Sequence, residues 1–166
     1  KEKFFYGHII TLVCSFIMAI AWGPPYTYGI FIQPLQAEFG WTRAVTAIAY
    51  SLIMFVRGLF HIVAGRTTDR FGPRIVVSVS AIFVGLGYVL MSQISTVWQL
   101  YLFYGVIIAI GLSGDYVPLV STVARWFTKR RGMMTGLVMA GISVGTMIMP
   151  PVVQRLISAY DWRTTF

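Results

Sequence analysis

Five apolar runs, each about as long as a bilayer is thick, decide what this chain can fold into. They cover residues 4–31, 44–64, 75–91, 97–124 and 133–157, and short polar connections separate them. A helix needs about 20 apolar residues to cross the hydrocarbon core of a membrane. The runs therefore predict five complete transmembrane helices, and residues 161–166 look like the entrance to a sixth span that continues beyond this chain. The fold class expected is an all-α membrane protein.

Composition agrees with a membrane protein and argues against other classes. Hydrophobic residues make up 57% of 166 residues, charged residues 11%, and the mean hydropathy is +0.76, which is far above the usual level for a soluble domain. The net charge of +8 would suit nucleic acid only on the polar face of a soluble domain. Here the basic residues stand at the ends of apolar runs, so we expect a lipid bilayer and no nucleic acid as partner.

Residues that could act as metal ligands, nucleophiles or bases are few. His8 and His61 lie on separate spans, and Cys14 lies alone in an apolar run. Neither a metal-ligand cluster nor a nucleophile paired with a base can be recognised. We therefore expect no cofactor, no metal and no enzyme activity.

The distribution of Lys and Arg predicts the orientation. Nine of them fall on one side of the five spans and three on the other, with Arg57 inside a span. Cytoplasmic loops carry the excess of positive charge, so the expected protein is a multi-pass protein of the cell (inner) membrane with a cytoplasmic N-terminus. The nine residues are Lys1, Lys3, Arg66, Arg70, Arg74, Arg125, Lys129, Arg130 and Arg131.

Several ordered motifs resemble one known family. Residues 65–74 read G-x-x-x-D-R-x-G-x-R, similar to the loop between the second and third helices of the major facilitator superfamily. Residues 111–118 (G-x-x-G-x-Y-x-P), 126–136 (W-F-x-K-R-R-G-x-x-x-G) and 140–150 resemble its monocarboxylate transporter and oxalate–formate antiporter branch. The segments Y-G-I-F at 28–31 and F-G-W-T-R at 39–43 fit the same branch.

The resemblance covers the whole chain but only the first half of the family's fold. It implies that residues 1–166 are an N-terminal six-helix bundle whose C-terminal half is absent, and that the complete protein moves small organic anions by alternating access, with proton coupling or by exchange. The alternatives are a non-transporting membrane scaffold or truncated half, or a transporter of another substrate class. Whether the coding sequence continues past Phe166 into six more spans distinguishes them.

Within this family the 65–74 segment implies a conformational latch. Asp69 would make contacts with arginines and helix ends that differ between conformational states. We expect Arg125 to be its partner. The alternative is a solubilising loop charge or a helix cap. The complete set expected for the latch is Gly65, Asp69, Arg70, Gly72, Arg74 and Arg125. The two glycines would permit close approach of the helices.

Two charges fall inside the predicted spans. Arg57 lies eight residues before Gly65 and Asp115 ten residues before Arg125, so they reach depths of roughly 12 and 15 Å from the same side. A paired charge costs much less in a membrane than two isolated ones, and intramembrane charges usually mark function. His61 follows Arg57 by one helical turn.

The roles of these charged residues stay open. Asp115 or His61 could carry a proton. Alternatively, Arg57 and Asp115 form a purely structural pair with His61 idle. Asp115 could also cap a helix segment broken near Gly114 and Pro118.

Three tyrosines, Tyr26, Tyr28 and Tyr116, are the predicted cavity-lining residues of this half. Their hydroxyls can donate to a carboxylate while the rings form an apolar wall. Membrane-interface tyrosines are the alternative for Tyr26 and Tyr28. The first-helix lysine of the resembling monocarboxylate carriers corresponds to Tyr26 here, which leaves anion exchange or another driving ion open.

Glycines and prolines predict local features of two helices. Gly141 and Gly145 form a small-residue packing face in the fifth span. The prolines at 150–151 predict a kink near its outer end, and residues 23–25 (G-P-P) predict an interruption of the first span.

Overall fold

The computed structural model describes residues 6–127 and 130–165. Lys1, Lys3 and Lys129 of the basic side, and Phe166, lie outside the described residues. In this part of the chain five helices are long and apolar enough to cross a membrane, which confirms the expected fold class. The first three are α1 (Tyr6–Phe39), α2 (Arg43–Phe71) and α3 (Pro73–Met91).

The fourth crossing is a composite rod. It consists of α4 (Val97–Leu100), the π-helical segment η1 (Tyr101–Ile108), α5 (Ala109–Ser113) and α6 (Tyr116–Trp126). The fifth is α7 (Arg131–Ala159), and a single turn, α8 (Trp162–Thr165), follows it. A capping box starts the fourth rod. The Thr96 side chain accepts from the Gln99 amide, and the Gln99 side chain accepts from the Thr96 amide.

The helices continue past the expected ends of the spans. α1 runs without interruption through Pro24, Pro25 and Pro34, so the break predicted at 23–25 is wrong. Membrane helices tolerate proline where neighbouring helices and local backbone adjustments satisfy the freed backbone groups. α7 likewise continues through Pro150 and Pro151.

The segment 65–74 is mostly helix rather than loop. α2 extends to Phe71 and α3 begins at Pro73, so Gly72 alone separates them. Gly72 has φ of 85°, and its amide donates to the carbonyl of Thr68 at 2.9 Å. Glycine adopts this backbone conformation without a Cβ penalty, and proline is favoured in the first turn of the following helix.

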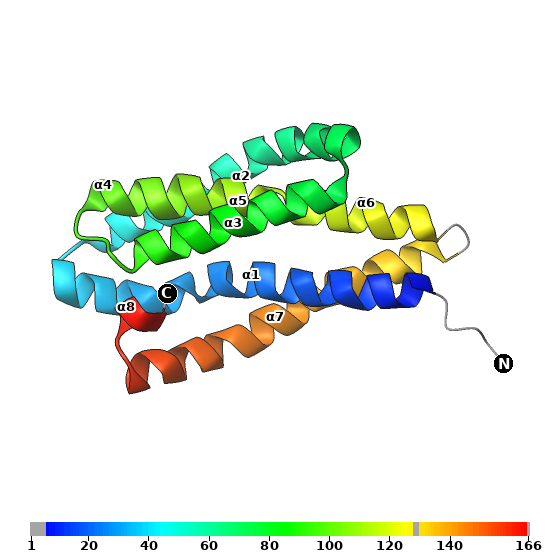
Figure 1. Cartoon of the computed structure of the whole chain (residues 1–166). Helices are drawn as coiled ribbons and strands as arrows, with labels where there is room; N and C mark the ends of the chain where they lie inside the picture. The colour runs from blue at the N-terminus through cyan, green and yellow to red at the C-terminus, as the bar shows by residue number, and fades with distance from the viewer. Residues whose placement is uncertain (1–5, 128–129, 166) are drawn as a thin grey trace.

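The five rods pack in two groups that α6 connects (Figure 1). α1 and α7 form the most extensive helix pair, while α2 and α3 both pack against η1 and α5. A Cβ atom on Gly141 or Gly145 would collide with the backbone carbonyls of Ser15 and Ala19 in α1. The two glycines therefore allow the α1 and α7 backbones to touch, as the packing motif predicted.

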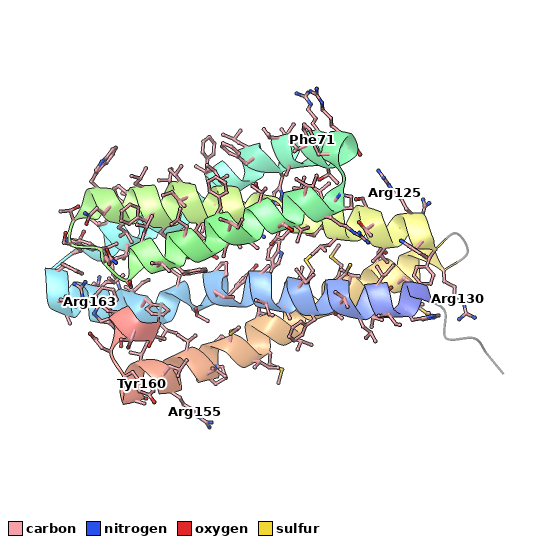
Figure 2. The ribbon with its side chains drawn as sticks, in the orientation of Figure 1. Phe71, Arg125, Arg130, Arg155, Tyr160 and Arg163 are labelled. Carbon is pink, nitrogen blue, oxygen red and sulfur yellow. The ribbon has the colours of Figure 1, made fainter. Side chains whose placement is uncertain are left out.

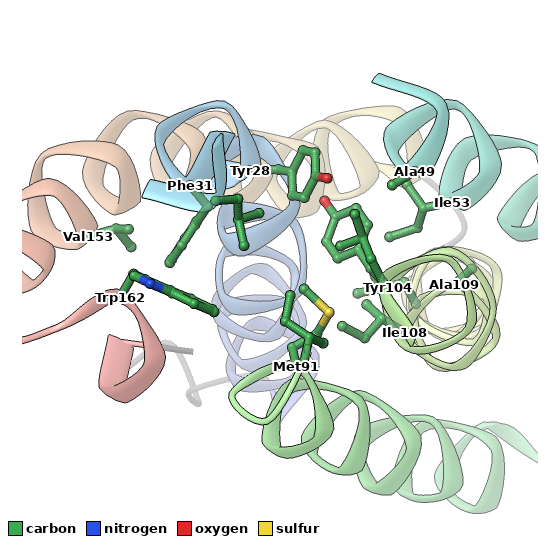
Figure 3. Close-up of a cluster of buried hydrophobic side chains, with 14 residues drawn as sticks. Tyr28, Phe31, Ala49, Ile53, Met91, Tyr104, Ile108, Ala109, Val153 and Trp162 are labelled. Carbon is green, nitrogen blue, oxygen red and sulfur yellow. The ribbon is translucent and has the colours of Figure 1, made fainter. Parts of the chain in front are cut away.

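The core consists of two buried clusters along the bundle. One cluster (Figure 3), near α8, joins α1, α2, η1 and the end of α7. Its residues include Tyr28, Ile53, Tyr104 and Trp162. The other cluster joins α1, α6 and α7 around Met18, Val123 and Val138. Many other apolar side chains are exposed on the helices, as expected for surfaces that contact lipid or further helices.

The two ends of the bundle differ in the residues they carry (Figure 2). Phe71, Arg125 and Arg130 lie at one end, and Arg155 and Tyr160 lie at the other. The basic segments after α2 and α6 therefore share one end of the molecule, as the predicted topology requires.

Polar contacts secure the opposite end. Glu38 at the end of α1 accepts hydrogen bonds of 2.6 Å from both Trp162 Nε1 and Arg163 Nη2. Arg163 also donates through Nη1 to the Ser92 carbonyl at 3.2 Å. The first turn after α7 is thus held against the ends of α1 and α3.

Candidate functional site

The two intramembrane charges meet as the sequence predicted. Arg57 Nη2 lies 3.1 Å from Asp115 Oδ2 and 3.4 Å from Oδ1. The side chains are 3% and 7% exposed, so the ion pair is buried within this bundle. Asp115 stands at the start of α6, where the fourth rod breaks, but its side chain makes no capping hydrogen bond. The contact with Arg57 therefore accounts for the carboxylate better than the capping alternative.

Trp22 covers the ion pair from α1. The guanidinium carbon of Arg57 lies 3.7 Å from the centroid of the Trp22 ring, which is a cation–π contact in a desolvated place. Sequence reasoning did not select Trp22. The available signal was its position four residues before Tyr26, which puts both on one face of α1.

An aromatic wall extends from Trp22 across three helices. Trp22 stacks on Tyr26 with centroids 6.3 Å apart and meets Tyr116 of α6 at 6.2 Å. Tyr116 in turn meets the ring of His61 on α2 edge-on at 6.2 Å. Half of Tyr26 is exposed, so the wall opens to the surface of the bundle. Tyr26 and Tyr116 are thus brought together, next to the charge pair.

His61 is anchored at the break in the fourth rod. Its Nδ1 donates to the carbonyl of Ser113 at 2.9 Å, because a carbonyl can only accept. In a neutral ring Nε2 is then left as the acceptor. His61 therefore follows Arg57 on the same face of α2, as expected, and joins the site through Tyr116 and Ser113 rather than through Asp115.

Tyr28 lies apart from this wall. It is 2% exposed, its hydroxyl donates to the Thr46 carbonyl at 3.2 Å, and its ring stacks on Tyr104 at 4.2 Å (Figure 3). It lines a cavity of about 320 Å³ between α1, η1, α3 and α7. Two residues along α1 turn a side chain to nearly the opposite face, which separates Tyr28 from Tyr26.

The predicted latch residues are only partly assembled. Arg125 Nη2 lies 3.3 Å from Asp69 Oδ1, with side chains 66% and 76% exposed. Arg70 instead lies over the ring of Phe71, and Arg74 lines a cavity of about 660 Å³ between α1, α3 and α6.

The two latch glycines do not act through close helix approach. A Cβ on Gly65 would lie 3.8 Å from Val117, an ordinary contact, and one on Gly72 would meet nothing within 4 Å. The expectation of close approach at these positions is therefore wrong. Gly72 is required by its backbone angle, as described above, and no such requirement exists at Gly65.

Across the described ranges 6–127 and 130–165, no three His, Cys, Asp or Glu side chains are grouped as a metal site would need. What the site offers is a buried cation with one carboxylate, covered by an indole and bordered by phenols and an imidazole. Such a set can bind a small polar group by charge and hydrogen bonds while excluding water.

Comparison with known proteins assigns the family. The family model described as Major Facilitator Superfamily matches residues 11–166. The chain belongs to the major facilitator superfamily. It is therefore a multi-pass membrane protein of a transporter family, as the motifs suggested.

Curated relatives agree with this assignment. The chain is 33% identical over 153 residues to "MFS-type transporter 1" of an Ophiocordyceps species, covering 91% of this chain and 33% of the relative. It is 31% identical over 161 residues to "Monocarboxylate transporter 4" of Rattus norvegicus, covering 97% and 34%. It is 28% identical over 158 residues to "Monocarboxylate transporter 12" of Xenopus laevis, covering 95% and 34%. The chain thus spans about a third of the length of these relatives.

Proposed function

We propose that this chain is the N-terminal half of a secondary transporter for small organic anions, monocarboxylates or similar acids, in the cell (inner) membrane. A second bundle, the C-terminal half, completes the cavity, and the two bundles rock about a central site. The basic end of the described bundle faces the cytoplasm, together with the N-terminus.

The observation that carries the proposal is the buried Arg57–Asp115 pair beside an aromatic wall that opens to the bundle surface. Charges inside a membrane are costly and usually mark a substrate or ion pathway. Phenol and indole groups combine apolar surface with hydrogen-bond donors, which suits a small organic acid. The names of the Rattus and Xenopus relatives support the same substrate class.

Coupling is proposed to involve a proton or an exchanged anion. Asp115 and His61 are the candidates for a proton carrier, because both belong to the site and both can change charge. The resembling carriers have a first-helix lysine at the position of Tyr26. If proton coupling requires that cation, the tyrosine here favours exchange of anions instead.

The Asp69–Arg125 contact is proposed as the latch of the cytoplasmic end. It joins the last turn of α2 to the end of α6. An exposed ion pair contributes little stability, so it can form and break as the bundles move.

A counterflow assay tests the function. The coding sequence is extended past Phe166, and the complete protein is reconstituted into liposomes preloaded with unlabelled lactate, oxalate or formate. We expect transient accumulation of the matching labelled acid. Accumulation of only another class of solute would place the protein elsewhere in the superfamily. No accumulation, or no further spans after Phe166, would favour a non-transporting scaffold.

A further inference from the structure

Arg57 uses only one of its three nitrogens in the ion pair. Both oxygens of Asp115 lie against Nη2, at 3.1 and 3.4 Å, whereas Nε and Nη1 are buried without a hydrogen-bond partner. A carboxylate that fully engages an arginine takes two neighbouring nitrogens in a fork. Asp115 therefore makes half of a fork and leaves donors for a second acceptor.

The surroundings of Arg57 contain more donors than acceptors. Nε1 of Trp22, whose ring lies over the guanidinium, is also buried without a partner. Buried donors that lack an acceptor are costly. An excess of donors around a cation is the arrangement that an incoming anion would satisfy.

We propose that Arg57 is the carboxylate receptor of this half. Nη1, at the end of the guanidinium, donates to the carboxylate of the substrate, while Nη2 remains with Asp115. Trp22 covers one face of the guanidinium at 3.7 Å, so the anion approaches along the guanidinium edge, where the N–H groups point. This assignment rests on the proposed transport of organic anions and specifies the group that recognises them.

Asp115 tunes the receptor. The Arg57 cation and the Asp115 carboxylate oppose each other at the site, whereas His61 is held away at Ser113. An arriving carboxylate is attracted by Arg57 and repelled by Asp115. Neutralising Asp115 while keeping its shape should therefore strengthen anion binding, whereas a purely structural pair predicts weaker binding or none.

The test uses uptake of labelled lactate, oxalate and formate by the complete transporter in liposomes. Asp115→Asn should lower KM several-fold. Arg57→Gln combined with Asp115→Asn removes both charges, so it should fold but show no saturable uptake. Arg57→Lys keeps a buried charge but has one nitrogen where arginine has three. It cannot hold Asp115 and the substrate on separate nitrogens, so KM should rise by about tenfold or more, the loss of one charge-assisted hydrogen bond. If the neutral double variant does not fold, Arg57→Lys alone tests whether Arg57 binds the substrate carboxylate.

Arg155→Gln, an exposed arginine at the far end of the bundle, is the matched control and should leave uptake unchanged. The receptor would be overturned, and the pair shown to be structural, by either of two results. One is a wild-type KM in the double variant or in Arg57→Lys; the other is a higher KM in Asp115→Asn. A wild-type protein that moves none of these acids overturns the proposed function, and the receptor with it.

Discussion

At the scale of single residues, the site depends on one buried cation and the groups that compensate it. Arg57 is acceptable inside the bundle because Asp115 offsets its charge and Trp22 covers its face. Removing one partner of a buried pair leaves an uncompensated charge, whereas removing both leaves only a packing defect. This difference can be measured independently of transport.

A double-mutant cycle on stability separates the two cases. We expect Asp115→Ala to destabilise the bundle by about 3–5 kcal/mol, because the Arg57 charge is left buried and alone. Arg57→Met combined with Asp115→Leu should cost clearly less. Thermal unfolding of the purified protein in detergent measures both. Equal destabilisation by the single and the double change would argue against an energetically coupled pair.

At the scale of elements, the bundle is held by close backbone contact between α1 and α7. Gly141 and Gly145 face carbonyl groups of α1, which cannot move aside as a flexible side chain can. Association of membrane helices depends on such packing, because lipid is as apolar as the helices. The glycines of α7 are not equivalent, since a Cβ on Gly136 would meet nothing within 4 Å.

Alanine substitution of these glycines tests the contact. Gly141→Ala or Gly145→Ala should lower the unfolding temperature, because an added methyl group forces α1 and α7 apart. Gly136→Ala is the matched control in the same helix and should be neutral or slightly stabilising, since alanine favours helix over glycine. Thermal unfolding of the three variants side by side provides the measurement. Similar losses at all three positions would contradict the assigned contact face.

At the scale of the whole molecule, basic residues are more numerous at one end. The ends of α2 and α6 meet there through Asp69 and Arg125, whereas Arg155 and Tyr160 lie at the other end (Figure 2). A bundle inserted with its basic end in the cytoplasm places the proposed latch on the cytoplasmic side.

Cysteine accessibility tests the orientation. Cys14 is buried, and it is the single cysteine of the sequence, so Cys14→Ser provides the background. Cysteines introduced at Arg70 and Arg130 should react with an impermeant thiol reagent only after the membrane is opened. A cysteine at Tyr160 should react from outside intact cells. Labelling of the Arg70 and Arg130 positions from opposite sides would contradict the topology.

The latch makes a kinetic prediction. Asp69→Asn removes the ion pair with Arg125 but leaves the Arg57 site untouched. We expect the maximal rate of transport to change several-fold and KM to change little, because the exposed pair biases conformations rather than binding substrate. Initial-rate measurements on the complete transporter distinguish the two parameters. An unchanged rate would remove the latch from the mechanism.

Much of the fold followed from local sequence. Hydropathy indicates where a helix crosses a membrane and basic residues indicate which ends lie together, because both properties act residue by residue. Counting residues from the helix ends placed Arg57 and Asp115 at similar depth, and their contact agrees with that count. Backbone chemistry was less predictable: α1 continues through its prolines, and α2 continues to Phe71.

What the sequence alone determined is therefore the number of crossings, which of their ends lie together and the depth of the buried charges. Only the tertiary structure decided which face of each helix turns inward. That choice put Trp22 over Arg57, turned Tyr28 into the core and left Tyr26 at the surface of the bundle. The physical reason is that the rotation of a helix about its axis is set by packing against its neighbours, whereas lipid and apolar protein interiors attract the same residues.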